Sequence, residues 1–181
     1  MIRITGGEFR GRKIKSPPGD FSRPTIDRVR KALFDILQDS ILRSVFLDLY
    51  SGVGLVGIEA LSRGADKVIF VEKDQNLVRV LKENLRLLNI HDKGVVFNAD
   101  AAAALPQAIR FKPDIIFLDP PYSEGDIPKI LRRLSLVDLK ENCLAAAQHS
   151  VKEKVLDHYG ILKLKRQERY GETMLSFFRI R

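Results

Sequence analysis

The 181-residue chain has very few of the residues that carry redox and metal chemistry: it contains one cysteine and three histidines. The single Cys143 excludes an internal disulfide, and its apolar neighbours in the sequence indicate a buried structural thiol. The histidines are dispersed and show none of the spacings of a metal site. We therefore expect a metal-free protein of the cytoplasm.

Long apolar runs are also missing. No stretch approaches the ~20 residues that a membrane helix needs, and residues 1–7 lack the apolar region of a signal peptide. No internal repeat or low-complexity tract is present. With 45% hydrophobic and 30% charged residues, the chain suits one domain with a real core, and we expect a monomer without a membrane partner.

Positive charge is abundant but unevenly distributed, within a formal net charge of +8. Residues 1–31 have a net charge of +6, residues 46–126 of −3, and residues 127–181 of +6. Basic ends around a mildly acidic centre indicate a catalytic centre framed by phosphate-binding surfaces. Solvated basic faces without a partner would give the same pattern.

Apolar periodicity predicts alternating strands and helices from residue 45 onward. We expect strands at 45–50, 68–72, 94–98, 114–118 and 143–148, and helices at 55–63, 75–89, 101–110 and 128–134. This order predicts a Rossmann-like α/β fold with a mostly parallel, seven-stranded sheet. The last two strands, 161–170 and 173–180, are separated only by Gly171-Glu172 and predict an antiparallel hairpin. Class I methyltransferases have this arrangement, which disfavours a dehydrogenase.

The N-terminal residues differ from the rest in composition. Residues 1–24 alternate short β-like pieces with glycine and proline, which predicts a basic hairpin extension before a main domain at 25–181. Thr25 is the expected N-cap of a helix that continues to about Gln38. The apolar face of that helix includes Val29 and Leu33, and we expect its basic side chains to point away from the core.

A glycine-rich loop, residues 48–54, follows the first core strand and opens a helix. Gly52 and Gly54 allow a tight turn and close approach of the backbone to a ligand. Glu72, at the end of the next strand, fits the adenosine ribose of either a dinucleotide or S-adenosylmethionine. Asp48 separates these options, because a carboxylate repels a pyrophosphate but favours the cationic groups of S-adenosylmethionine.

A third acid stands at the third strand end. Asp100 can accept a hydrogen bond from an adenine amino group, although a plain helix cap is the alternative. Acids at three successive strand ends predict a pocket for the cofactor S-adenosyl-L-methionine. The residues that we expect to form it are Asp48, Tyr50, Ser51, Gly52, Gly54, Glu72, Lys73, Asp100 and Ala101.

The tetrapeptide Asp119-Pro120-Pro121-Tyr122 follows the expected strand at 114–118, and open α/β sheets bind ligands at this end of their strands. Its carboxylate, proline carbonyl and aromatic ring can hold a flat base that carries an amino group. A rigid turn that only ends the strand is the alternative. With the cofactor loop, the tetrapeptide predicts methyl transfer to an exocyclic amine of a nucleic-acid base, with these four residues as the catalytic set.

These motifs resemble a known family nearly end to end. Residues 6–12, the segment Arg23-Pro24-Thr25, the loop at 48–54, the tetrapeptide and residues 170–173 are similar to the bacterial 16S ribosomal RNA guanine-N2 methyltransferases of the small-subunit methyltransferase D type. Adenine-N6 DNA methyltransferases share the tetrapeptide, so it indicates chemistry and not substrate. The chain departs from the family pattern at Ser51, Val53 and Gln148, and Gln148 leaves the role of the fifth strand end open.

The resemblance implies a mechanism. The target guanine would leave its stack and lie on Tyr122, while Asp119 and the Pro120 carbonyl accept its amine hydrogens. In-line transfer needs positioning and charge placement, and no covalent enzyme intermediate. The implied partner is ribosomal RNA or a small-subunit assembly particle. The residues implied in RNA contact are Arg10, Arg12, Lys13, Arg23, Thr25, Arg28, Arg30 and Lys31.

Three other functions stay open at this point. A nicotinamide-dependent reductase is supported by the glycine pattern alone. A non-catalytic RNA-binding assembly factor would share the basic ends but has no need of Asp119. A DNA adenine-N6 methyltransferase would share the tetrapeptide, although the chain has no separate region for target recognition.

Overall fold

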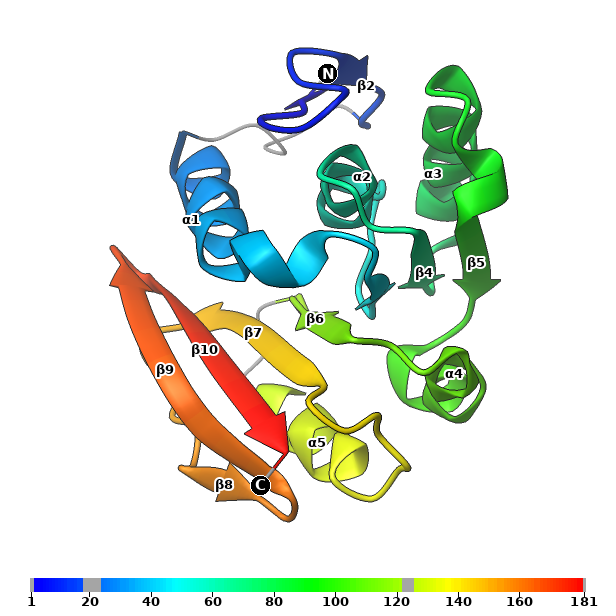
Figure 1. Ribbon diagram of the computed structural model, residues 1–181. Coiled ribbons are helices and arrows are strands. Elements are labelled where there is room, and N and C mark those ends of the chain that lie inside the picture. The colour runs from blue at the N-terminus through cyan, green and yellow to red at the C-terminus, as the bar shows by residue number, and fades with distance from the viewer. Residues whose placement is uncertain (1, 18–23, 122–125, 181) are drawn as a thin grey trace.

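The computed structural model describes residues 2–17, 24–121 and 126–180 (Figure 1). Two predicted site residues, Tyr122 and Arg23, lie outside the described residues. A short antiparallel hairpin, β1 (Ile2–Arg3) and β2 (Lys13–Ile14), precedes the long helix α1 (Pro24–Ile41). The remaining elements build one sheet with helices on both of its faces.

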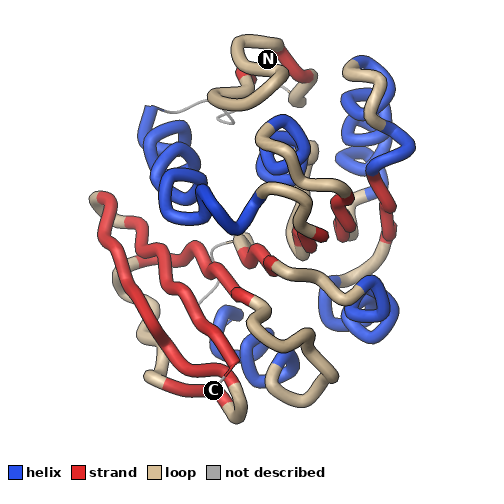
Figure 2. Tube along the Cα trace, in the orientation of Figure 1, coloured by secondary structure: helices blue, strands red, loops and turns tan. Residues whose placement is uncertain are grey.

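The central sheet has eight strands in the order β5-β4-β3-β6-β7-β10-β9-β8. Neighbours from β5 to β7 are parallel, whereas β10 is antiparallel to both β7 and β9 (Figure 1). Figure 2 shows the strands in red, with helices in blue on both sides of the sheet. The mostly parallel sheet and its antiparallel hairpin are therefore confirmed. The strands are β3 (Val45–Asp48), β4 (Lys67–Glu72), β5 (Gly94–Asn98), β6 (Ile115–Leu118), β7 (Leu144–Ser150), β9 (Leu162–Tyr170) and β10 (Thr173–Ile180).

The expected number of strands was wrong by one. The additional strand β8 (His158–Tyr159) pairs antiparallel with the start of β9 at the edge of the sheet. Two residues are too short to show a period-two apolar pattern, so the sequence gives no signal for this strand.

The strands bury apolar side chains on both faces, as parallel strands of an α/β sheet do. Phe46 of β3 packs with α1, α2 and α3 on one face, and Leu47 packs with α4 and α5 on the other (Figure 1). The helices after α1 are α2 (Leu55–Ser62), α3 (Gln75–Leu87), α4 (Ala101–Ala108) and α5 (Asp126–Leu134), with 3₁₀ turns at His91–Lys93 and Ile109–Phe111.

Helix starts agree only partly with the sequence. Asp74 caps α3 by accepting from the backbone N–H groups of Asn76 and Leu77, as predicted. Helix α1 instead begins at Pro24, so Thr25 lies in its first turn and is not the N-cap. Proline is well suited to a first helical position, because that residue's N–H has no partner within the helix.

The N-terminal hairpin packs on the main body of the protein. Its side chains Ile2, Ile4, Phe9 and Ile14 are buried in the same apolar cluster as those of α1 and α2. The hairpin therefore presents its basic residues to solvent while its apolar residues extend the core.

Candidate cofactor and catalytic site

Two adjoining cavities lie at the carboxyl ends of the parallel strands. The first has a volume of about 390 Å³, and its lining includes the ends of β4, the glycine loop and the first residues of α4. The second has a volume of about 230 Å³ and lies between α1, the glycine loop and the end of β7. Tyr50, Gly52 and Asp119 line both cavities, so these three residues form the boundary between them.

The first cavity contains most of the residues predicted to hold a cofactor. Its lining includes Tyr50, Gly52, Glu72, Lys73, Asp100 and Ala101, together with Asp119 and Pro121 of the tetrapeptide. Glu72 accepts from the backbone N–H of Gly52 at 2.9 Å and from that of Asp74 at 2.8 Å. This carboxylate therefore fixes the glycine loop against the start of α3.

Asp100 is the N-cap of α4, which is the alternative role that the sequence left open for it. One carboxylate oxygen, Oδ1, accepts from the backbone N–H groups of Ala102 and Ala103 at the start of α4. The residue also lines the first cavity and is exposed. Helix capping and a place in the cavity wall are thus combined in one side chain.

The glycines of the loop serve different purposes. Gly52 has a φ of +55°, and a Cβ there would meet no described atom within 4 Å, so it would project into open cavity space. Gly54 lines neither cavity, and a Cβ there would lie 2.3 Å from Leu81 of α3. Gly54 therefore permits helix packing, and only Gly52 leaves room for a ligand.

Ser51 connects two strands. Its hydroxyl donates to the carbonyl oxygen of Asp48 at 2.8 Å and accepts from the N–H of Val71 at 3.0 Å. It lines the second cavity, but both of these bonds hold β3 against β4. Serine at position 51, where the sequence differs from the family pattern, therefore supplies a hydroxyl that links the ends of these two strands.

Asp48 and Asp119 are two carboxylates with unusual electrostatics. Burial raises the pKa of Asp48 to about 7, with further raising from the charges of Asp119 and Glu72, against the lowering effect of the Gly57 N–H. Burial also raises the pKa of Asp119 to about 7, and a hydrogen bond from Gln148 opposes this shift. Both groups line the second cavity, which therefore favours a cationic ligand.

Gln148 is a site residue that sequence reasoning missed. Its Nε2 donates to Oδ2 of Asp119 at 3.1 Å, from the strand next to the one that ends at Asp119. A neutral donor there holds the carboxylate without adding a second negative charge. The sequence indicates that Gln148 lies at the end of a strand. It does not indicate that Asp119 is its partner, because the two residues are 29 positions apart in the sequence.

The apolar wall of the first cavity was also missed. It is formed by Leu49, Val71, Leu77 and Ala99. Sequence patterns assign such residues to the core, and their place beside a cavity depends on how the strand ends and α3 are arranged.

Comparison with known proteins decides the family. Residues 2–179 match the model of a family described as Conserved hypothetical protein 95. YlbH of Bacillus subtilis strain 168, a candidate rRNA methyltransferase, is 34% identical to this chain. The match covers 99% of this chain and 100% of the length of YlbH. Ribosomal RNA small subunit methyltransferase D of Escherichia coli K12 is 39% identical over 74% of this chain and 67% of its own.

The chain belongs to the ribosomal RNA small subunit methyltransferase D family. A solved structure agrees: a candidate methyltransferase of Escherichia coli covers 99% of this chain and 97% of its own with a TM-score of 0.86 and 29% identity. The fold is thus that of the class I methyltransferases, as predicted, and the reductase alternative is wrong.

The basic residues predicted for RNA contact divide into two groups in this methyltransferase family member. Arg10, Arg12, Lys13, Arg28 and Lys31 are exposed on the hairpin and on α1. Arg30 does not belong to this exposed group: the residue is only 3% exposed, and its Nε donates to Glu59 at 2.7 Å. Arg30 is three residues from Leu33 and seven from Leu37, which are both buried, so it lies on the apolar face of α1 that was assigned to the core.

Neither a metal-binding cluster nor a membrane-spanning helix occurs among the described residues. Within the described ranges, no three His, Cys, Asp or Glu side chains are grouped so that they could hold a metal ion. The described helices include none that is both long enough and apolar enough to cross a membrane. Cys143 is buried, and burial raises its pKa to about 12, so this thiol does not form a reactive thiolate.

Proposed function

We propose that the protein transfers a methyl group from S-adenosylmethionine to the exocyclic N2 amine of a guanine in 16S ribosomal RNA. The observation that carries this proposal is the position of Asp119, on the boundary of two cavities. A group there can face a cofactor on one side and a nucleobase on the other. The family names support RNA as the substrate, since the relatives are named as ribosomal RNA methyltransferases.

The residues of the first cavity fit the proposed cofactor. Glu72 and Asp100 supply carboxylates at the ends of neighbouring strands, apolar side chains line the wall, and the missing Cβ of Gly52 leaves space in the cavity. An adenosine needs this combination of acceptors for its hydroxyl and amino groups and an apolar surface for its base. When bound, S-adenosylmethionine would supply the methyl group and a neutral thioether as leaving group.

The catalytic contribution of the chain would come from the tetrapeptide. Asp119 and the Pro120 carbonyl accept the two hydrogens of the guanine amine, which holds the nitrogen lone pair toward the methyl group. After it has gained the methyl group, the amine would carry one proton too many and must lose it. Asp119, with a pKa near 7, is suited to receive that proton or pass it to water.

Tracing the product tests the proposal. Purified protein, labelled S-adenosylmethionine and either 16S RNA or small-subunit particles lacking the modification are incubated, and the nucleosides are separated by mass spectrometry. We expect label in N2-methylguanosine. In a parallel incubation with DNA, label in N6-methyl-2′-deoxyadenosine would instead establish the adenine alternative. RNA binding without any transfer would establish a non-catalytic assembly factor.

The exposed basic residues of the hairpin are the proposed RNA-binding surface. Replacing Arg10, Arg12 and Lys13 together with Ala should lower the slope of log affinity against log salt by about 2 to 3, because each phosphate contact contributes ~0.7 to 0.9. Fluorescence titration with 16S RNA at several salt concentrations measures this slope. We expect little change in thermal stability, since the contacts of Arg12 with the Leu87 carbonyl and the Phe9 ring are exposed or weak.

A matched control removes the same charge from the far edge of the sheet. Lys163, Lys165 and Arg166 are exposed on β9, and their replacement with Ala should leave the salt slope nearly unchanged. Equal reductions for both triple variants would show that net charge, and not the hairpin surface, controls RNA binding.

A further inference from the structure

We propose that Arg30 and Asp48 form a two-point clamp for the amino-acid end of the methyl donor, in which the guanidinium binds its carboxylate and Asp48 binds its ammonium group. This inference rests on the proposed function, because it assigns the second cavity to the part of S-adenosylmethionine that lies beyond the adenosine. It gives Arg30 a role in cofactor binding in place of RNA contact.

The clamp is indicated by two buried atoms of opposite charge. Nη1 of Arg30 and Oδ1 of Asp48 are buried, and neither has a hydrogen-bond partner within the described part of the chain; the third such atom, Oδ1 of Asp27, already forms an ion pair with Nη2 of Arg30 at 3.0 Å. The other polar atoms of both side chains are occupied: Oδ2 of Asp48 accepts from the Gly57 N–H at 3.1 Å, and Nε and Nη2 of Arg30 donate to Glu59 and to the Arg3 carbonyl. A buried charged atom without a partner is costly, which indicates that a ligand completes both groups.

Both side chains line the second cavity, from elements on different sides of it. Arg30 comes from α1 and Asp48 from the end of β3. No ion pair joins the two side chains, although each forms contacts elsewhere in the described structure. A ligand between them must therefore offer an anion to Arg30 and a cation to Asp48, and an α-amino acid carries both charges on one carbon.

The two cavities are connected in the way that one extended ligand requires. Tyr50, Gly52 and Asp119 line both, and the open space beside Gly52 is not filled by a side chain. A molecule whose adenosine lies near Glu72 and Asp100 can thus extend past Gly52 toward Asp48 and Arg30. The methyl-bearing sulfur lies between these two ends of the cofactor, so Asp119 at the boundary is placed for transfer.

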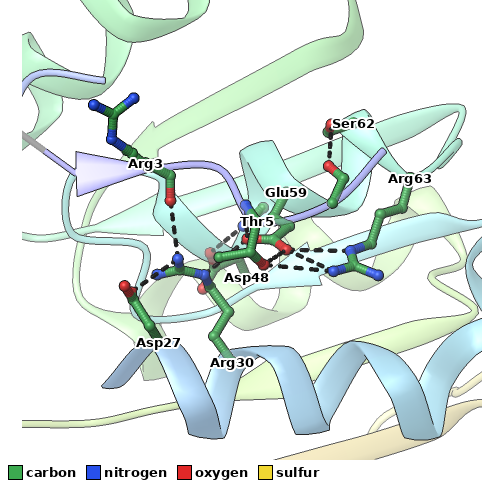
Figure 3. Close-up of polar contacts among 10 residues, drawn as sticks. Arg3, Thr5, Asp27, Arg30, Asp48, Glu59, Ser62 and Arg63 are labelled. Atoms are coloured by element: carbon green, nitrogen blue, oxygen red, sulfur yellow. Dashed lines mark hydrogen bonds and ion pairs between the residues drawn. The ribbon is translucent and has the colours of Figure 1, made fainter. Parts of the chain in front are cut away.

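The guanidinium is held firmly for this purpose. Figure 3 shows it between Asp27, Glu59 and the backbone of Arg3, with ion-pair distances of 3.0 Å to Asp27 and 2.7 Å to Glu59. Glu59 is itself fully buried and also pairs with Arg63 at 2.8 Å. The contacts with Asp27, Glu59 and the Arg3 carbonyl therefore fix the orientation of the guanidinium. Nη1 takes part in none of them and is available to a ligand in the second cavity.

An RNA phosphate is a weaker candidate for the same guanidinium. Asp48 and Asp119 line this cavity as well, and both carboxylates would repel a group that carries only negative charge. A zwitterion matches the pair of charges, whereas a phosphate matches only one of them.

Truncated ligands test the clamp directly by calorimetry. S-adenosylmethionine and its decarboxylated form differ only in the carboxylate, whereas 5′-methylthioadenosine lacks the whole amino-acid end and also the sulfonium charge. We expect the wild-type protein to bind S-adenosylmethionine at least about 10-fold more tightly than the decarboxylated form, which corresponds to about 1.4 kcal/mol. The Arg30→Lys variant keeps a positive charge for Glu59 but has no second nitrogen to reach the cavity, so this preference should disappear.

Arg63→Lys is the matched control, because Arg63 also pairs with Glu59 but lines neither cavity. It should keep the preference for the carboxylate. Equal affinity of the wild-type protein for S-adenosylmethionine and its decarboxylated form would overturn the clamp while leaving the cofactor assignment intact. If Arg30→Lys does not fold, this wild-type comparison decides alone. Binding of none of the three ligands would overturn the proposed function as well.

Discussion

Replacing Asp119 with Ala is expected to reduce methyl transfer by at least ~100-fold, the scale of losing one preorganised group that acts in the transition state. The side chain lies on the boundary of the two cavities and is the acceptor proposed for the guanine amine. Binding of S-adenosylmethionine should change little, because Glu72, Asp100 and the clamp residues remain. Single-turnover rates with 16S RNA, beside calorimetry for the cofactor, separate the two effects, and near-wild-type turnover would contradict the mechanism.

The same carboxylate predicts a pH dependence. With its pKa raised to about 7, Asp119 is mostly protonated below that pH, so it is a weaker acceptor for its amine hydrogen and cannot receive the proton that the amine loses. Transfer should therefore rise as the pH increases through about 7 and then level. Because the Gln148 hydrogen bond lowers this pKa, Gln148→Ala should move the rise to higher pH. Asp48 has a similar pKa but no bond to Gln148, so an unchanged profile in this variant would assign the titration to Asp48.

The largest effect on stability is expected at Glu59. This fully buried carboxylate accepts from Arg30 Nε at 2.7 Å, from Arg63 Nη2 at 2.8 Å and from the backbone N–H of Thr5 at 3.3 Å (Figure 3). Glu59→Ala leaves the buried Arg30 without its main counter-charge, and removing one partner of a buried pair costs about 3–5 kcal/mol. Urea denaturation should show this loss in the free energy of unfolding.

Glu83→Ala provides the comparison for that measurement. Glu83 pairs with Lys15 at 2.9 Å, but its side chain is 48% exposed. Exposed pairs contribute about 0–1 kcal/mol, so this variant should unfold close to the wild type. Equal losses in the free energy of unfolding of the two variants would mean that burial does not determine how much the Glu59 ion pairs stabilise the protein.

The site was predictable to the extent that it depends on strand ends. Asp48, Glu72, Asp100 and Asp119 each follow an apolar strand, and the parallel order of those strands brings their carboxyl ends to one edge. That argument needs only local patterns and chain order. These two properties of the sequence are enough to bring the four carboxylates to the edge where both cavities lie.

The remaining features depend on contacts between distant segments. Arg30 looks like any basic helical residue until Glu59, 29 positions later, is placed opposite it. Gln148 has a meaning only beside Asp119, and Gly54 only against α3. Composition and periodicity describe one segment at a time, so they cannot distinguish an arginine that binds solvent from one that completes a cavity.

The place of β10 within the sheet also has a consequence during synthesis. This strand contains residues 173–180 and lies between β7 and β9, with Phe177 and Phe178 buried. A nascent chain thus exposes the edge of β7 until residues 173–180 have left the ribosome, and an exposed strand edge can pair with other chains. A stop before residue 173 would remove this inner strand of the sheet, so we expect such truncated products to aggregate.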